Sequence, residues 1–280
     1  MDLIDFCRAH GIVVNSLPPI GVWKRYPTED HPKSKNGAVK YMGDHAFVQN
    51  HATQTDVSVW KPESVDQIDR EKYRLIAKRE ADLQAKNQKL ASDKAAFIIK
   101  SSQLAHHNYL KAKGFPDETG YVWVSPDGHV LVIPMRIDGH LVGCQLIDEH
   151  GSKKFLYGQR SNDAEFVFDN KGVHIYCEGY ATALSVRQAL KSRKIRYTIH
   201  VCFSAHNLLR MTQKYGHGLV IADNDKSETG QRIAKESMLP YWISDIEGED
   251  GNDYHLRMGL FRFSQGLASK LIASRELSTT

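Results

Sequence analysis

The second half of the sequence alternates between short apolar runs and longer segments with helical spacing. Apolar runs predict strands, and amphipathic segments predict helices, in this order: strand 173–177, helix 181–191, strand 197–203, helix 205–215, strand 218–222, helix 229–239, strand 241–246 and a last helix after 252. Alternation of this kind is typical of a parallel, doubly wound sheet with helices on its faces. The pattern therefore predicts an α/β domain over residues 171–280.

The first part of the chain has a different pattern, in which short runs alternate between apolar and polar residues. A short helix is expected at the start, ended by Gly11, and it is followed by small β-rich regions over 1–60 and 114–170. Turns between their strands are expected at Asn36-Gly37, Gly43-Asp44, Pro126-Asp127-Gly128 and Asp138-Gly139. Both regions are expected to form small, mainly antiparallel sheets.

Residues 61–113 separate these two β-rich regions and favour a helix. The segment from Pro62 to Lys113 has no glycine and is rich in Lys, Glu, Gln and Ala. One strong apolar residue recurs every seven positions, which is too few for a coiled coil; these residues are Ile76, Leu83, Leu90, Phe97 and Leu104. We expect a helical connector that lies partly on the next domain and ends at Gly114.

The composition is that of an ordinary globular protein, with 280 residues, 41% hydrophobic and 25% charged. The N-terminus has no apolar run long enough for a signal peptide or a membrane span, and the four cysteines form no C-x-x-C pair. These features predict a cytoplasmic protein with buried free thiols and no membrane contact. The net charge of +4 permits a nucleic-acid partner without requiring one, because a local basic groove matters more than the sum.

Carboxylates follow three of the predicted strands in the second half of the chain. Glu178 comes directly after strand 173–177, and Asp223 and Asp225 come after strand 218–222. The segment after the next strand supplies Glu247, Glu249, Asp250 and Asp253. Because ligand sites in such sheets lie beyond the carboxyl ends of the strands, these acids are expected to meet at one edge.

A cluster of carboxylates points to a divalent cation. Like charges raise each other's pKa unless a cation shares them, and hard oxygen ligands suit Mg²⁺ or Mn²⁺. Such sites support phosphoryl or nucleotidyl transfer. The alternative is that these acids are loop residues and helix N-caps, because Asp is common before a helix. That alternative applies more easily to Asp225 or Asp253 alone than to Glu178, Asp223 and Asp225 together.

Two of these acidic segments carry a family resemblance. "CEGYATALS", followed by "IADNDKSETGQRIAKES", resembles the Toprim domain, the metal-binding fold of bacterial-type primases, topoisomerases and some nucleases. In that family a Glu-Gly pair ends the first strand and an Asp-x-Asp ends a later one. The resemblance implies that Glu178, Asp223 and Asp225 are catalytic metal ligands, supported by Asp250 or Asp253. Gly179 is expected to let the chain turn tightly after Glu178.

The segments beside these motifs narrow the resemblance to primases. "VLVIPMRIDGHLVGCQLIDEHGSKKFLYGQR" resembles the basic region that precedes the Toprim fold in primases, and "GEDGNDYH" resembles an acidic segment of phage and plasmid primases. The match implies a DNA primase that uses single-stranded DNA and NTPs. It also implies nucleotide or template binding by Arg136, Lys153, Lys154 and Arg160. Lys226, next to the acids, is a further candidate for a phosphate contact, although its place at the start of a helix favours a solvated charge.

The N-terminal region departs from bacterial primases, which begin with a zinc ribbon. Residues 1–60 hold one cysteine, Cys7, and resemble the zinc-free leader of phage and plasmid primase-like proteins. The stretch from Lys24 to Lys40 has five basic and two acidic residues around Tyr26, which suits either single-stranded nucleic acid or a solvated hairpin. The chain has no G-x-x-x-x-G-K-[ST] loop, so a helicase would be a separate partner.

Two other functions remain open at this point. A Toprim nuclease would use the same acids to hydrolyse a phosphodiester, but it would not need the basic strand region that precedes the predicted sheet. A non-catalytic nucleic-acid-binding replication module is the second alternative. Loss of Glu178 or of the Asp223 and Asp225 pair would indicate it, and all three are present. Synthesis by nucleotidyl transfer is therefore the leading expectation.

Overall fold

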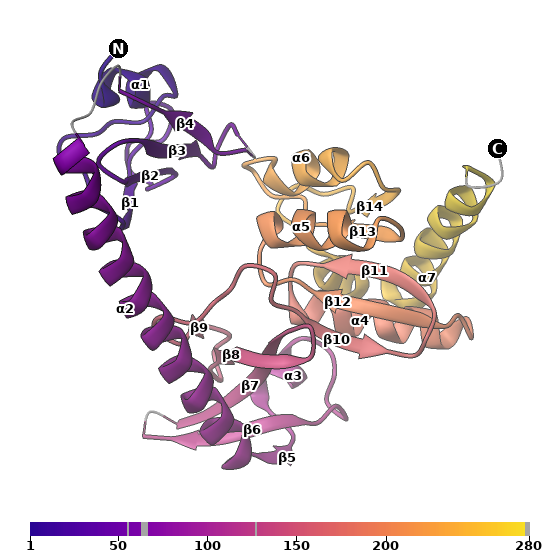
Figure 1. Ribbon diagram of the computed structural model, residues 1–280. Helices are drawn as coiled ribbons and strands as arrows, with labels where there is room; N and C mark the ends of the chain where they lie inside the picture. The colour runs from indigo at the N-terminus through magenta and orange to yellow at the C-terminus, as the bar shows by residue number, and fades with distance from the viewer. Residues whose placement is uncertain (55, 63–66, 127, 278–280) are drawn as a thin grey trace. The chain divides into compact units, whose positions relative to one another are not determined.

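The computed structural model describes residues 1–54, 56–62, 67–126 and 128–277 (Figure 1). The chain divides into two compact units, Met1–Lys86 and Asn87–Thr280. The division falls inside one long helix, α2 (Gln67–Lys100), so that each unit contains part of it. The structure is a mixed α/β protein with three separate sheets. None of the described helices is long and apolar enough to cross a membrane.

The first unit is built around a four-stranded antiparallel sheet. Helix α1 (Leu3–Ala9) precedes the strands, which follow in spatial order as β1 (Trp23–Tyr26), β2 (Gly37–Tyr41), β3 (Ala46–Asn50) and β4 (Ser58–Trp60). The short helix ended by Gly11 and the small sheet are confirmed, as is the turn at Gly43-Asp44. The turn expected at Asn36-Gly37 is wrong. Gly37 begins β2, where a Cβ would lie 2.5 Å from the side chain of Ile12.

Helix α2 is confirmed, but it ends earlier than the sequence pattern predicts. It stops at Lys100, and a strand β5 (Gln103–Ala105) and a short helix α3 (Asn108–Ala112) follow before Gly114. In the second unit α2 buries Ala91, Ala95 and Ile98 against a sheet, which confirms that it lies partly on the next domain. The residues of the heptad pattern point elsewhere, and Leu83, Leu90, Phe97 and Leu104 are more than half exposed.

The sheet under α2 is antiparallel and has the order β5-β6-β7-β8-β9. Its strands are β6 (Gly120–Ser125), β7 (Gly128–Ile137), β8 (His140–Ile147) and β9 (Lys153–Phe155). The turn at Asp138-Gly139 is confirmed, and both of its residues have positive φ. Asp127 in the other predicted turn lies outside the described residues. The pairing of β7 with β8 shifts register between Met135 and Arg136.

The third sheet carries the strand–helix alternation expected for residues 171–280. Strands β11 (Val173–Cys177), β12 (Tyr197–Val201), β13 (Leu219–Ala222) and β14 (Tyr241–Ile243) are parallel, in the spatial order β12-β11-β13-β14. The connecting helices are α4 (Tyr180–Ser192), α5 (Ala205–Tyr215) and α6 (Thr229–Glu236), and α7 (Gly251–Leu277) follows β14. One strand was not foreseen in this sheet: β10 (Phe166–Asp169) pairs antiparallel with β12 at its edge.

Both faces of this third sheet are covered, so the strands are buried on both sides. Ile175 and Cys177 of β11 pack with α4 and α7, whereas Tyr176 packs on the opposite face with α5 and α6. The apolar runs of the sequence are continuous for this reason. On the Tyr176 face, the carboxylate of Glu165 accepts hydrogen bonds from His200 Nδ1 (2.5 Å) and Tyr215 Oη (2.7 Å).

Candidate functional site

The candidate site lies at the point where the strand order of the third sheet reverses. The chain leaves β11, forms β12 on one side of it, and then returns to form β13 on the other side. Ligands in open α/β sheets bind beyond the carboxyl ends of the strands at this switch point. Glu178 follows β11 and Asp223 follows β13, and the two strands pair in parallel with Cys177 opposite Ile221. The topology therefore places these two acids side by side.

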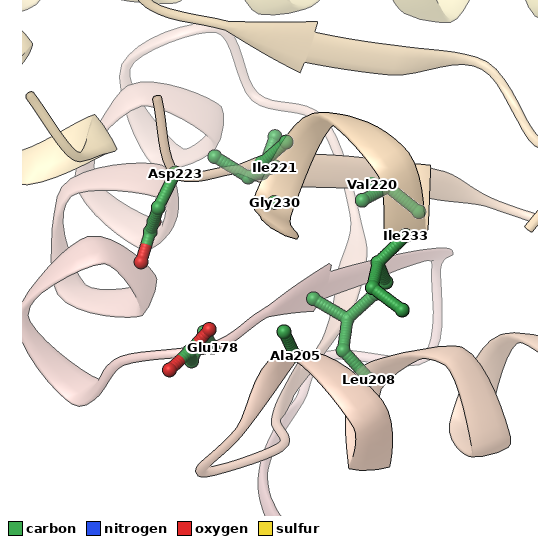
Figure 2. Close-up of a pocket in the computed structure, with 9 residues that line it drawn as sticks. Glu178, Ala205, Leu208, Val220, Ile221, Asp223, Gly230 and Ile233 are labelled. Carbon is green, nitrogen blue, oxygen red and sulfur yellow. The ribbon is translucent and has the colours of Figure 1, made fainter. Parts of the chain in front are cut away.

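A small pocket separates Glu178 and Asp223. Figure 2 shows the side chain of Asp223 directed toward Glu178 across the pocket, whose apolar wall includes Ala205, Leu208 and Ile233. Its volume is about 10 Å³, room for a single water-sized species. One oxygen of Asp223, Oδ1, is buried and has no hydrogen-bond partner among the residues that the structure describes. An unpaired carboxylate oxygen beside a second acid indicates that this position suits a cation.

The electrostatics of the two acids support this interpretation. Burial raises the pKa of Asp223 to about 8, and the nearby negative charges of Glu178, Asp250 and Asp225 add to the effect. Burial likewise raises the pKa of Glu178, with further contributions from Asp225 and Asp250, while the positive charge of Lys153 opposes the shift. These mutual interactions define an acid cluster of Glu178, Asp223, Asp225 and Asp250. The acids predicted after three different strands do converge.

Asp225 has a structural role as well as a place in the acid cluster. Its Oδ1 accepts hydrogen bonds from the backbone N–H of Ser227 (2.8 Å) and from the Ser227 hydroxyl (2.5 Å). Longer contacts run from its carboxylate to the backbone N–H groups of Thr229 and Gly230 at the start of α6. The helix-cap alternative raised for Asp225 therefore describes part of what it does. Its charge still acts on Glu178 and Asp223.

Asp250 and Asp253 lie at the start of α7 and have different interaction partners. Asp250 Oδ1 accepts from the backbone N–H groups of Asn252 (2.8 Å) and Asp253 (2.9 Å), and its charge acts on both Glu178 and Asp223. Asp253 forms an ion pair with Lys113, with an Oδ1 to Nζ distance of 3.5 Å. Asp250 is thus a member of the acid cluster, whereas Asp253 lies at its flank.

The other acids after β14 are not part of the cluster. Glu249 is bound by Arg257 and by the Ser244 hydroxyl, and these hydrogen bonds lower its pKa. Glu247 is exposed in the loop before α7. The sequence pattern alone did not separate these residues from Asp250.

Lys153 is the predicted basic residue that the structure brings to the acid cluster. It is the first residue of β9, and its Nζ lies 4.0 Å from the position that a Cβ on Gly179 would occupy. Its positive charge acts on Glu178 and Asp223. Lys154 is the next residue of the same strand, so its side chain points to the opposite face. The two adjacent lysines therefore have different surroundings.

The remaining predicted basic residues have local partners or lie in exposed loops. Arg136 donates to the backbone oxygen of Gly139 (3.0 Å) beside the register shift of β7. Arg160 forms a 2.8 Å ion pair with Asp163, which also binds Arg210. Lys226 is exposed in the loop after Asp225. None of Arg136, Lys154, Arg160 and Lys226 is among the charges that shift the pKa of Glu178 or Asp223.

Two residues near the site were missed from the sequence. Thr182 Oγ1 and Asn252 Oδ1 are buried and have no hydrogen-bond partner within the described part of the chain. Thr182 lies one helical turn after Glu178, and its Oγ1 is 4.0 Å from the Cβ position of Gly179. Asn252 donates to the carbonyl of Lys113 and to Ser185 Oγ, both at 3.0 Å. The helical spacing from Glu178 was the available signal for Thr182.

The structure corrects the role expected for Gly179 and assigns one to Gly230. Gly179 has ordinary extended backbone angles (φ −102°, ψ 151°), so the chain needs no glycine to turn there. A side chain at Gly179 would meet no atom closer than 4.0 Å, so this position leaves open space beside Glu178. At Gly230 a Cβ would clash with the backbone oxygen of Asp223. Gly230 is therefore the glycine that the packing of this corner requires.

The donor chemistry of the acid cluster fits Mg²⁺ or Mn²⁺. Within residues 1–54, 56–62, 67–126 and 128–277, no three His, Cys, Asp or Glu side chains lie close enough together to hold a metal ion directly. Mg²⁺, however, is usually bound through one or two carboxylates, while waters and substrate phosphates complete its coordination. The carboxylates of Asp223, with its unpaired Oδ1, and of Glu178 are the one or two protein ligands of this kind. Their raised pKa values show that burial and neighbouring acids destabilise the negative charge of both.

Comparisons with family models, curated proteins and solved structures find no match for this chain.

Proposed function

We propose that this chain is a DNA primase with a Toprim-type catalytic domain. It would synthesise short RNA primers from NTPs on single-stranded DNA, by nucleotidyl transfer that depends on Mg²⁺ or Mn²⁺. The observation that carries the proposal is the meeting of Glu178 and Asp223 at the switch point of a parallel sheet, with Lys153 beside them. Crowded acids suit a divalent cation, and the adjacent lysine suits a phosphate.

Each member of the acid cluster has an expected part in this reaction. A bound divalent ion would supply charge neutralisation for the attacking and leaving oxygens of phosphoryl transfer. Asp223 and Asp225 would hold the ion, and Asp250 would support them. The pKa of Glu178 is raised by burial, which suits a carboxylate that takes up a proton from an attacking hydroxyl. Asp253 is paired with Lys113 and would act through Asp250.

Basic residues would bind the nucleotide and the template. Lys153 lies close enough to Glu178 and Asp223 for its charge to act on both. It would therefore also neutralise a triphosphate that is bound beside these acids. Arg136, Lys154 and Lys226 remain proposed template contacts that lie further from these acids. Arg160 would have to leave its ion pair with Asp163 to reach a phosphate. A separate replicative helicase is the expected protein partner.

Primer synthesis by the purified chain tests the proposal. With Mg²⁺ or Mn²⁺, NTPs and single-stranded DNA of several sequences, we expect short RNA products on a denaturing gel. Glu178→Gln and Asp223→Asn should abolish synthesis while the far-UV circular dichroism stays unchanged. The matched control is Glu247→Gln, since this exposed acid of the same loop region lies outside the acid cluster.

Two outcomes would favour other functions. Metal-dependent cleavage of DNA or RNA without synthesis on any template would indicate a Toprim-type nuclease. Binding of single-stranded DNA with neither synthesis nor cleavage would indicate a non-catalytic replication module. The position of Lys153 on the strand region before the third sheet favours synthesis, since a nuclease does not need this region.

A further inference from the structure

The sheet of the first unit has one face toward its core and one face away from it. Tyr26, Val39 and Val48 belong to the core with α1. Side chains alternate between the faces of a strand, so the neighbours of these residues point to the other side. Ala38 and Gln49 also point to this side but are buried. We therefore define the outer sheet face by the residues Trp23, Arg25, Lys40, Phe47 and Val59.

The outer sheet face contains a row of side chains that crosses all four strands. The strand pairing places Trp23 opposite Lys40, Lys40 opposite Phe47, and Phe47 opposite Val59. The rings of Trp23 and Phe47 approach to 6.4 Å between centroids, although they start two strands apart. Trp23 and Val59 are 47% and 48% exposed. Two aromatic rings thus stand together on a surface that the core does not cover.

Positive charge lies within and beside this row. Lys40 lies between Trp23 and Phe47 in the strand pairing, and Arg25 lies two residues after Trp23 on the same face. The ring of His45 packs edge-on against Phe47 at 5.1 Å. Lys40 therefore shares one row with two aromatic residues whose rings lie close together.

The chemistry of the row favours a partner that offers both flat rings and negative charges. An apolar protein surface placed over Trp23 and Phe47 would bury the ammonium group of Lys40 without a partner, which is costly. A single-stranded nucleic acid avoids this cost, because its bases stack on aromatic rings while its phosphates pair with Lys and Arg. We also expect such binding to depend little on the nucleotide sequence, since every base has a stacking face.

We propose that the outer sheet face binds single-stranded nucleic acid, with Trp23 and Phe47 stacking bases and Lys40 and Arg25 contacting phosphates. This site is built from residues other than the acid cluster and needs no metal ion. Of the five basic residues between Lys24 and Lys40, it uses Arg25 and Lys40, while Tyr26 belongs to the core and is not available for stacking. The proposal rests on the proposed function only for the choice of a nucleic acid as the polymer.

Binding of a labelled oligonucleotide to the full chain tests this proposal. The probe is a fluorescein-labelled dT oligomer of about 15 nucleotides, followed by fluorescence anisotropy in EDTA. Trp23→Leu and Phe47→Leu should each weaken binding about fivefold or more, the loss expected for one stacked base. Lys40→Gln should reduce the slope of log affinity against log salt by about 0.7. The control Phe261→Leu removes a 72% exposed ring of α7 and should change nothing.

Four results would overturn the proposal. Wild-type affinity in both Trp23→Leu and Phe47→Leu would do so, as would a salt slope unchanged by Lys40→Gln. Self-association that these variants abolish, with oligonucleotide binding intact, would identify the face as a contact between copies of the chain. The assay contains neither metal nor NTP, so its result can be interpreted even if the chain synthesises no primers. If Glu178→Gln weakens binding and the outer-face variants do not, the oligonucleotide binds at the acid cluster instead.

Discussion

The raised pKa of Asp223 makes a quantitative prediction about stability in the absence of metal. In the folded protein this carboxyl keeps its proton up to a pKa of about 8, whereas the unfolded chain loses it near the ordinary value of 3.8. Between these pH values the folded state binds more protons than the unfolded state. Stability from this group is therefore complete below the unfolded pKa and is lost as the pH rises toward the folded pKa.

The size of the effect follows from the shift. One proton difference changes the free energy of unfolding by at most about 1.4 kcal/mol per pH unit, so a shift of roughly four units sets an upper limit of about 5–6 kcal/mol. Glu178, whose pKa is also raised, shares the interaction with Asp223, so its own protonation relieves part of it. We expect a loss of about 2–3 kcal/mol between pH 5 and pH 8.

The perturbation is Asp223→Asn, which keeps the shape of the side chain and removes its charge at every pH. Urea unfolding in EDTA, followed by circular dichroism from pH 5 to pH 8, should show the falling stability in the wild type and a flatter profile in the variant. Near pH 8 the metal-free variant should be the more stable protein. Adding Mg²⁺ at pH 8 should stabilise the wild type and leave the variant unchanged.

The control is Asp253→Asn, whose carboxylate pairs with Lys113 and is not among the charges that shift the pKa of Asp223. This variant should keep the wild-type slope between pH 5 and pH 8. The reasoning would be refuted if the metal-free wild type were equally stable, or more stable, at pH 8 than at pH 5. It would also be refuted if Asp223→Asn retained the full slope.

Three further predictions address single positions. Lys153→Gln should lower primer synthesis about tenfold in a steady-state assay, while Lys154→Gln, on the opposite face of β9, has a smaller effect; equal effects would contradict the facing assigned to them. Gly179→Ala should leave the melting temperature unchanged, whereas Gly230→Ala should cost about 1–3 kcal/mol in urea unfolding because its Cβ meets backbone. Glu165→Gln should cost about 1–3 kcal/mol at pH 7 because it removes the charge that strengthens the buried hydrogen bonds from His200 and Tyr215. Burial raises the pKa of Glu165, but the hydrogen bonds from His200 and Tyr215 outweigh it and hold this pKa below its ordinary value of 4.5. The loss should therefore be complete above about pH 4.5 and should shrink as the pH falls below it. A cost that does not change over this range would argue against this origin.

Much of the third sheet could be predicted because its signals are local. Continuous apolar runs such as 173–177 and 218–222 mark strands buried on both faces, and the helical spacing between them marks the covering helices. The rule that parallel strands end at one edge then brings Glu178 and Asp223 together. Strand periodicity and topology therefore predicted that Glu178 and Asp223 lie side by side, but they did not separate Asp250 from the other acids after β14.

Other features depended on contacts between distant residues, which no local pattern contains. The residues after Lys100 also favour helix, but α2 ends at Lys100 because the next segment forms β5, which pairs with β6. Strand β10 has the same alternating pattern as its predecessors, yet it joins the third sheet through β12.

The sequence by itself thus determined the order of the parallel strands and helices from β11 onward and the acids that follow these strands, because burial on both faces and helical periodicity are properties of short segments. Only the tertiary structure decided that Lys153 rather than Lys154 faces the acids and that Gly230 rather than Gly179 is required by packing. It also decided that Trp23, Lys40 and Phe47 form one row. Those choices depend on strand register and on which neighbour fills the adjacent space, and both are set by residues far away in the chain.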